Sequence, residues 1–151
     1  MTPARLALLV TLSLGIGACA TNPVTGREEL SLVSGREEIA IGEQQYGPAQ
    51  QAQGGPYYLD PKLQDYVRSV GNRLAAGSDR KLPYEFVVLN NPVPNAWALP
   101  GGKIAVNSGL LLQLHDEAEL AAVVGHEIVH AAARHSASQM SKGSLINLGA
   151  E

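Results

Sequence analysis

The chain has 151 residues, of which 45% are hydrophobic and 17% are charged. This length suits one domain with a hydrophobic core, and the composition is that of a globular protein rather than a disordered chain. Lys and Arg number 11 against 14 Asp and Glu, so the net charge is -3 and we expect no binding to nucleic acid. A single cysteine, Cys19, excludes an intrachain disulfide.

Residues 1–18 have the organisation of a signal peptide. One positive charge, Arg5, precedes the apolar run from Leu6 to Ile16, which is shorter than the ~20 residues that cross a bilayer. Ile16-Gly17-Ala18-Cys19 resembles the bacterial lipoprotein box, so we expect cleavage after Ala18 and lipidation of Cys19. An ordinary secretory signal followed by an unmodified cysteine is the alternative.

Residues 19–33 combine proline, glycine and polar residues without periodicity, and we predict a lipidated tether there. A folded domain is expected from residue 34 to residue 151. Ser34 and Glu37 form a capping pattern ahead of a helix predicted to run to Gln53. Asp60 and Pro61 then begin a second, amphipathic helix.

Two short strands are predicted next, over residues 84–89 and 103–107. The second follows a turn at Gly101-Gly102, alternates polar with apolar residues, and is expected to form one arm of a hairpin. Asp116 and Glu119 precede an alanine-rich helix over residues 120–134. This helix is apolar on nearly all sides, so we expect it to be buried. The elements together predict an α+β fold, mainly helical, with a small sheet or hairpin beside this helix.

The stretch His126-Glu127-Ile128-Val129-His130 lies within this apolar helix. Residues four apart project from one helix face, and two imidazoles can bind one Zn²⁺. Glu127 can act as the general base that takes a proton from the metal-activated water and passes it to the leaving amine. Burial of such polar residues is costly without a partner such as a metal ion. Histidines satisfied by hydrogen bonds in a packed core are the alternative.

A catalytic zinc site is expected to have a third protein ligand. His135 does not fit the three-histidine metzincin spacing, since it lies five residues after His130 and Ala133 replaces the glycine. We therefore expect His135 beside the ligands or at the surface. Glu151 follows His130 by a distance that some gluzincins use, which makes it a candidate third ligand at the last residue.

Several motifs follow one another in a fixed order along the chain: Asn22-Pro23-Val24-Thr25-Gly26-Arg27, Leu30-Ser31-Leu32-Val33-Ser34, Asn95–Gly102, Gly109-Leu110-Leu111, Glu117–Ala121 and Gly125-His126-Glu127. From about Thr21 to its end, the chain resembles the HtpX and CAAX-prenyl-protease family of zinc metallopeptidases. Among its members, the periplasmic BepA-like and LoiP-like lipoproteins are the most similar. The resemblance covers far more of the chain than the five-residue metal motif does.

This resemblance implies that residues 34–151 form the N-terminal part of a zincin-like (gluzincin) metallopeptidase domain with one Zn²⁺ per chain. It implies a metalloendopeptidase that hydrolyses misfolded or misassembled cell-envelope proteins, with the outer-membrane assembly machinery as a candidate partner. It further implies that Lys103, Ile104, Ala105, Val106 and Asn107 form an edge strand on which an extended substrate pairs. An ordinary hairpin arm is the alternative for this strand.

The family's third zinc ligand is a glutamate on a later helix, so this chain is expected to be truncated. Ala20 after the cysteine, where a retention aspartate is absent, points to a periplasmic protein anchored by lipid to the outer membrane. The alternative function is a membrane-tethered chaperone or adaptor, or an inactive fragment, that binds unfolded outer-membrane proteins without cleaving them.

Overall fold

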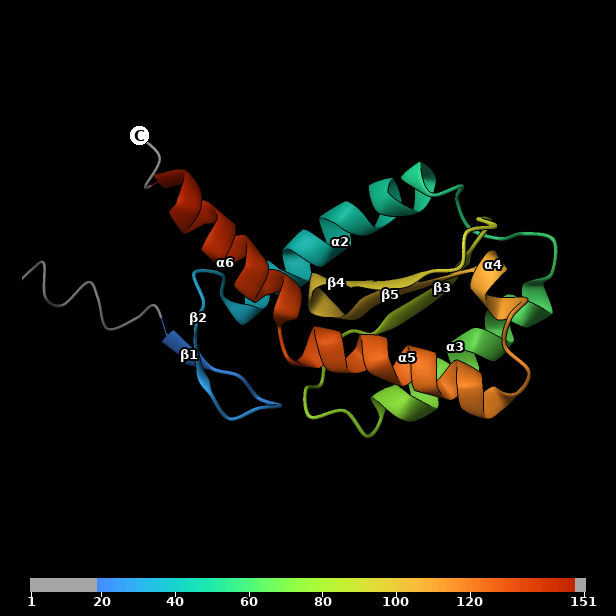
Figure 1. Ribbon diagram of the computed structural model, residues 1–151, viewed down its shortest axis with the longest axis horizontal. Coiled ribbons are helices and arrows are strands. Elements are labelled where there is room, and N and C mark those ends of the chain that lie inside the picture. Colours follow the sequence, from blue (N-terminus) through green and yellow to red (C-terminus); the bar gives the residue numbers. More distant parts are fainter. Residues whose placement is uncertain (1–18, 149–151) are drawn as a thin grey trace, which may run out of the picture.

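The computed structural model describes residues 19–148, so the expected signal peptide and Glu151 lie outside the described residues. Helices and a small mixed sheet make up an α+β fold, as the sequence predicts (Figure 1). The elements in chain order are β1 (Cys19–Thr21), β2 (Glu28–Leu30), α2 (Gly35–Ala52), α3 (Pro61–Ala75), β3 (Glu85–Leu89), β4 (Ala96–Leu99), the 3-10 turn η1 (Pro100–Gly102), β5 (Lys103–Asn107), α4 (Ser108–Leu111), α5 (Glu117–Ala132) and α6 (His135–Leu148). Within residues 19–148, no helix is both long and apolar enough to cross a membrane.

Capping residues begin α2 and α3 where the sequence predicts them. The Ser34 hydroxyl accepts a hydrogen bond from the Glu37 N–H, and the Glu37 carboxylate accepts one from the Ser34 N–H. Asp60 accepts hydrogen bonds from two backbone N–H groups at the start of α3, and Pro61 occupies its first position. Both N-termini therefore follow from local side-chain chemistry.

The larger sheet has the strand order β3-β5-β4, with β5 parallel to β3 and antiparallel to β4. β4 and β5 form a hairpin connected by η1. The prediction that Lys103, Ile104, Ala105, Val106 and Asn107 form an edge strand is wrong, because β5 pairs on both sides. The edges of this sheet are β3 and β4.

All five residues of β5 are buried, including its two polar residues, which have partners elsewhere in the chain although the Asn107 side-chain oxygen accepts no hydrogen bond within residues 19–148. The Lys103 ammonium group forms an ion pair with Glu85 on β3. The Asn107 side-chain amide donates a hydrogen bond of 3.0 Å to the Val93 carbonyl oxygen. Polar residues in the central strand therefore do not mark a solvent-facing edge.

The turn between β4 and β5 depends on glycine. Gly101 has a φ of 74°, in the left-handed region that favours glycine. A Cβ atom at this position would lie 2.8 Å from the Ile39 Cα atom of α2. α2 therefore packs directly on the backbone of the hairpin turn.

The hydrophobic core lies between the sheet and the helix pair α3 and α5 (Figure 1). On the other face of the sheet, α2 places the Tyr46 ring edge-on to Trp97, and the Tyr46 hydroxyl donates to the Ile104 carbonyl oxygen at 2.8 Å. Burial raises the pKa of the Tyr46 hydroxyl far above its ordinary value. Residues of all three strands and both helices form this core: Val67, Val70, Phe86, Val88, Ile104, Val106, Leu120, Val124 and Ile128, with Ala96 and Ala98 packed against them.

Helix α5 runs over Glu117–Ala132 and is not buried on all sides, which corrects the sequence prediction. Leu120, Val124 and Ile128 face the core, whereas the Val129 side chain on the opposite side is 49% exposed. Alanine and valine make the outer face apolar in sequence, although no element in residues 19–148 covers it. The helix ends at Ala132, because Arg134 takes a left-handed backbone conformation with φ 59°.

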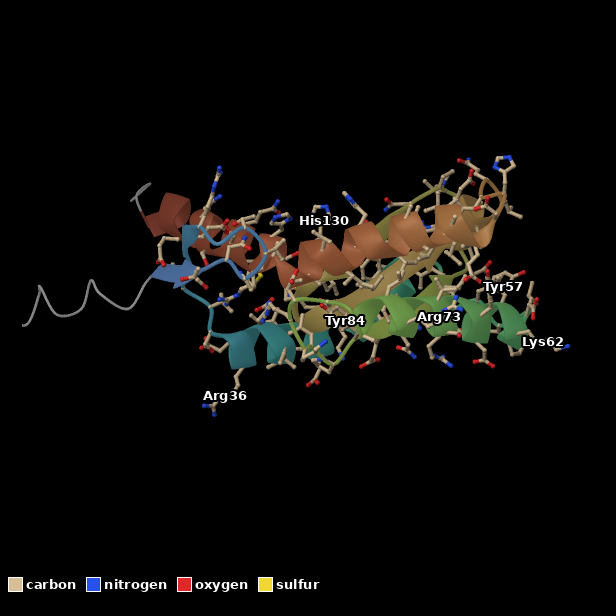
Figure 2. The ribbon with its side chains drawn as sticks, turned by 90° about the horizontal axis from the view of Figure 1, so that it is seen from below. Arg36, Tyr57, Lys62, Arg73, Tyr84 and His130 are labelled. Carbon is tan, nitrogen blue, oxygen red and sulfur yellow. The ribbon has the colours of Figure 1, made fainter. Side chains whose placement is uncertain are left out.

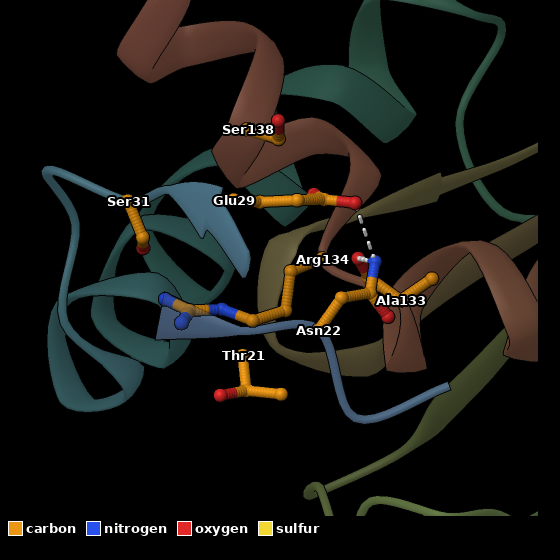
Figure 3. Close-up of a pocket in the computed structure, with 7 residues that line it drawn as sticks. All are labelled: Thr21, Asn22, Glu29, Ser31, Ala133, Arg134 and Ser138. Carbon is orange, nitrogen blue, oxygen red and sulfur yellow. Dashed lines mark hydrogen bonds between the residues drawn. The ribbon is translucent and has the colours of Figure 1, made fainter. Parts of the chain in front are cut away.

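Residues 19–33, predicted to be a tether, contain the antiparallel hairpin β1–β2, which lies against the junction of α5 and α6 (Figures 1 and 3). The Asn22 side chain donates hydrogen bonds to the Ala133 carbonyl oxygen at 2.9 Å and to the Glu29 carboxylate at 3.0 Å. The Leu32 N–H donates to the Ser141 hydroxyl at 3.0 Å. This segment is therefore attached to the folded domain at several points.

Candidate metal centre

Helix α5 brings His126 and His130 together, as their spacing predicts. Asp116 caps the helix by accepting a hydrogen bond of 2.9 Å from the Glu119 N–H. The Nε2 atoms of His126 and His130 lie 2.8 Å apart, and the rings meet at 75° with centroids 4.4 Å apart. Figure 2 shows His130 projecting from α5 on the side turned away from α3. The two side chains thus direct one nitrogen each to a common point.

The first turn of α5 also carries hydrogen bonds that stabilise charged carboxylates. The backbone N–H and the ring of His115 are hydrogen-bonded to the Glu119 carboxylate and hold its pKa below the usual value. Hydrogen bonds from Tyr66 and Arg73 likewise lower the pKa of the Glu117 carboxyl. Negative charge near a helix N-terminus is favourable, so these groups help to begin the helix that carries the histidines.

This pair of nitrogens fits a zinc ion. A tetrahedral zinc ion with bonds of ~2.0–2.1 Å holds two nitrogen ligands roughly 3.3 Å apart, so small ring rotations suffice. His126 is exposed and is therefore not a core histidine, while Glu127 and His130 are half-buried. Solvent can reach this face of α5.

A third ligand is not brought to this pair by the described chain. Among residues 19–148, no group of three or more His, Cys, Asp or Glu side chains is placed to hold a metal ion. Glu151 lies outside the described residues and stays a prediction. Cys19 lies in β1, distant in sequence from the histidine pair, and its lipidation also stays a prediction.

His135 lies beside His130 on the side opposite the paired Nε2 atoms. The Nδ1 atoms of His130 and His135 are 2.6 Å apart, and the two rings meet at 71° with centroids 4.7 Å apart. The sequence left open whether His135 lies beside the histidine pair or at the surface, and the structure places it beside His130. On a continuous helix, residues five apart lie roughly 140° apart around the axis, so the break after α5 makes this contact.

A buried ion cluster holds the junction of α5 and α6 and was missed by the sequence analysis. The Glu38 side chain on α2 is 1% exposed and accepts hydrogen bonds from both terminal nitrogens of Arg80 at 3.0 Å. It also accepts a hydrogen bond of 3.0 Å from the Arg134 Nε atom. Arg80 and Arg134 further donate to the backbone carbonyls of Ala131 and Val33. No local pattern in the sequence relates these three charges.

The edge strand β4 runs beside α5, and the opposite edge of the sheet is closed. The Gln64 side-chain amide donates to the Phe86 carbonyl oxygen and accepts from the Val88 N–H, which covers the free edge of β3. At β4, the Ser136 hydroxyl lies 3.4 Å from the Ala98 carbonyl oxygen. The edge that Gln64 does not cover is therefore that of β4, whose residues are half-buried and contact α5.

The register of β4 determines which of its backbone groups face outward. The Asn107 N–H donates to the Asn95 carbonyl oxygen, so these two residues form a hydrogen-bonded antiparallel pair. Pairs alternate along an antiparallel ladder, and Ala96 and Ala98 therefore occupy the non-hydrogen-bonded positions opposite β5. Their N–H and C=O groups turn away from β5, toward the free edge.

A domain with a histidine pair and a glutamate on one helix, beside a small sheet, has the arrangement of a metallopeptidase. Residues 61–149 match the model of peptidase family M48, which is more than half of the chain, and the chain belongs to this family. The resemblance drawn from the separate sequence motifs is thereby confirmed.

Two groups of curated proteins resemble the chain. It is 34% identical over 121 residues to the beta-barrel assembly-enhancing protease of Yersinia pestis, covering 80% of this chain and 24% of that protein. It is 41% identical over 88 residues to the putative beta-barrel assembly-enhancing protease of Vibrio cholerae, covering 58% and 18% respectively. It is 36% identical over 123 residues to the mitochondrial metalloendopeptidase OMA1 of Schizosaccharomyces pombe, covering 79% and 36%. The chain thus spans between 18% and 36% of the length of these relatives.

Proposed function

We propose that this chain is the N-terminal portion of a gluzincin-type zinc metalloendopeptidase, in which His126 and His130 hold one Zn²⁺ and Glu127 acts as the general base. The observation that carries this proposal is the convergence of the two Nε2 atoms at 2.8 Å on the accessible side of α5. The third ligand is expected from a glutamate on a later helix, with Glu151 as the candidate within this sequence.

Three side chains of α5 have different proposed roles in hydrolysis. Glu127 follows His126 directly on α5 and is half-buried, so it stands beside the pair in the helix and remains accessible to water. From this position it can accept a proton from the attacking water and deliver it to the leaving amine nitrogen. A bound zinc ion would supply Lewis-acid polarisation of the water and of the scissile carbonyl. His126 and His130 contribute by holding their Nε2 atoms at this point.

The substrate backbone is proposed to pair with β4. Ala96 and Ala98 direct their N–H and C=O groups away from β5, and the Ala98 carbonyl oxygen there accepts a hydrogen bond from the Ser136 hydroxyl at the start of α6. An extended peptide on this edge forms backbone hydrogen bonds that are independent of its sequence. Such binding suits a peptidase that accepts many unfolded proteins.

Misfolded or misassembled cell-envelope proteins are the proposed substrates, and the outer-membrane assembly machinery is a proposed partner. Support comes from relatives whose names state a role in beta-barrel assembly. The lipoprotein box supports a lipid on Cys19 and a location in the periplasm at the outer membrane. A non-cleaving chaperone or adaptor is the second candidate, because the described residues place only two ligands together.

A cleavage assay with a matched variant separates these functions. The chain from Cys19 is incubated with Zn²⁺ and an unfolded outer-membrane protein, and fragments are identified by mass spectrometry. The proposal expects new peptide termini with the wild-type chain and none with Glu127→Gln, in which an uncharged amide replaces the carboxylate. Binding of the substrate by both chains without any fragments would favour the adaptor instead.

A further inference from the structure

The short contact between His130 and His135 has a consequence for the protonation of His130. At 2.6 Å, the two Nδ1 atoms can approach only when one carries a proton and the other accepts it. The Nε2 atom of His130 in turn lies 2.8 Å from that of His126. The three rings thus form one chain of hydrogen bonds, His126–His130–His135, which can be ordered in two directions.

Only one direction prepares His130 for a metal ion. When the His130 Nδ1–H donates to His135, the His130 Nε2 atom keeps its lone pair and can bind a metal. When His135 donates instead, the proton of His130 moves to Nε2, and the ligand position is blocked. The first direction is also favoured without metal, because it places His126 and His135 in the Nε2–H tautomer, the more stable tautomer of a neutral histidine side chain. Metal binding then requires the His126 proton to leave Nε2, so that this atom can also act as a ligand.

The position of His135 is fixed by contacts outside the site. Arg134, with its φ of 59°, turns the chain between α5 and α6 so that the next residue returns toward His130. The Arg134 guanidinium is held by the buried Glu38 carboxylate and by the Val33 carbonyl oxygen. The Asn22 side chain binds the adjacent Ala133 carbonyl oxygen (Figure 3). These contacts prevent the junction from rotating His135 away.

We propose that His135 is a positioning residue that keeps His130 in the Nδ1–H tautomer and fixes the direction of its metal-binding Nε2 atom. This inference rests on the proposed metallopeptidase function, in which His130 is a ligand. Hydrogen bonds from a ligand's second nitrogen to a fixed acceptor set the tautomer and orientation of metal-bound histidines. Here the acceptor is the Nδ1 atom of His135, the first residue of α6.

Nuclear magnetic resonance tests the proposal directly in the metal-free chain. Long-range proton–nitrogen spectra at alkaline pH, where free imidazole is neutral, identify the tautomer of each histidine. We expect His130 to be protonated on Nδ1 in the wild-type chain, with a scalar coupling across the hydrogen bond to the His135 Nδ1 nucleus. A wild-type His130 protonated on Nε2 overturns the proposal, without the need for any variant.

Zinc affinity, measured by competition with a chromophoric chelator, provides the second readout. His135→Phe retains a ring without an acceptor, and we expect a 10- to 100-fold loss of Zn²⁺ affinity, in the range of other such contacts. His135→Asn places an amide oxygen close to the Nδ1 position and should recover most of this loss. His115→Ala removes an exposed histidine before the start of α5 but keeps the backbone N–H that binds Glu119, so zinc affinity should be unchanged.

The outcomes distinguish this inference from the proposed function. An unchanged zinc affinity and an unchanged His130 tautomer in His135→Phe refute the positioning role while leaving the metal site intact. If the wild-type chain binds no zinc while His130 is protonated on Nδ1, the proposed function is refuted for this chain. The hydrogen bond from His130 to His135 is then still supported. Thermal melting of each variant shows whether a loss of affinity follows from unfolding, and a loss that His135→Asn does not restore counts against the proposal.

Discussion

Removing the buried charge of Glu38 should destabilise the domain strongly. Glu38→Gln keeps the size of the side chain but deletes the carboxylate that receives three hydrogen bonds of 3.0 Å from Arg80 and Arg134. The side chains of Arg80 and Arg134 are only 16% and 15% exposed, so water has little access to replace the lost partner. Removing one member of a buried ion pair costs about 3–5 kcal/mol.

Urea denaturation followed by circular dichroism measures this loss. With a slope of about 2 kcal/mol per molar urea, a loss of about 3–5 kcal/mol lowers the unfolding midpoint by roughly 1.5–2.5 M. Glu43→Gln is the matched control, because Glu43 lies on the same helix α2 and is exposed. A midpoint for Glu38→Gln that coincides with that of Glu43→Gln would refute the reasoning about the ion cluster.

Further perturbations test the turn, with Gly125→Ala inside α5 as its matched control, the helix cap and the edge strand. Gly101→Ala forces a Cβ atom against the backbone of α2 at a positive φ and should destabilise the folded chain by about 1–3 kcal/mol. Gly125→Ala places a Cβ atom in open space and should stabilise the folded chain by about 0.5–1 kcal/mol. Hydrogen bonds within the capping box lower the pKa of the Glu37 carboxyl in the folded chain. The stabilisation of the folded state by Glu37 is therefore complete above the pKa of the unfolded chain, about 4.3, and is lost as pH falls through the lower pKa of the folded chain. Ala98→Pro removes an outward N–H at the free edge of β4 and should weaken peptide binding while leaving the melting temperature nearly unchanged.

Each of these expectations has a result that contradicts it. Equal melting temperatures for Gly101→Ala and the wild-type chain would show that α2 does not restrict the turn. If the melting temperature falls by the same amount in the wild-type and Glu37→Gln chains between about pH 6 and pH 2, Glu37 does not stabilise the helix cap. Unchanged peptide affinity in Ala98→Pro, measured by fluorescence anisotropy, would exclude pairing of the substrate on β4.

Local features of the sequence were sufficient for α2, α3 and α5 and for the histidine pair, but not for α4 and α6. Ser34, Asp60 and Asp116 accept hydrogen bonds from the first turn of their helices, and such caps depend only on neighbouring residues. The convergence of His126 and His130 follows from helical periodicity alone.

Features that depend on contacts between distant segments were not predictable from one sequence. The placement of Lys103–Asn107 at the sheet edge, which followed from the resemblance, failed because β5 pairs with both β3 and β4. The Glu38 cluster was missed because its arginines lie 42 and 96 residues away in the sequence. The exposure of Val129 on α5 was also missed, because composition does not show which face another element covers.

Zinc stoichiometry tests the central claim most directly. Native mass spectrometry of the chain from Cys19 to Glu151, after incubation with Zn²⁺, counts the ions that each folded chain retains. The account predicts one zinc ion per wild-type chain, none in His130→Ala, and one in Glu127→Gln, because the glutamate is the base and not a ligand. A folded wild-type chain without zinc, or equal zinc retention in His130→Ala, would contradict the assignment of this helix as a metal centre.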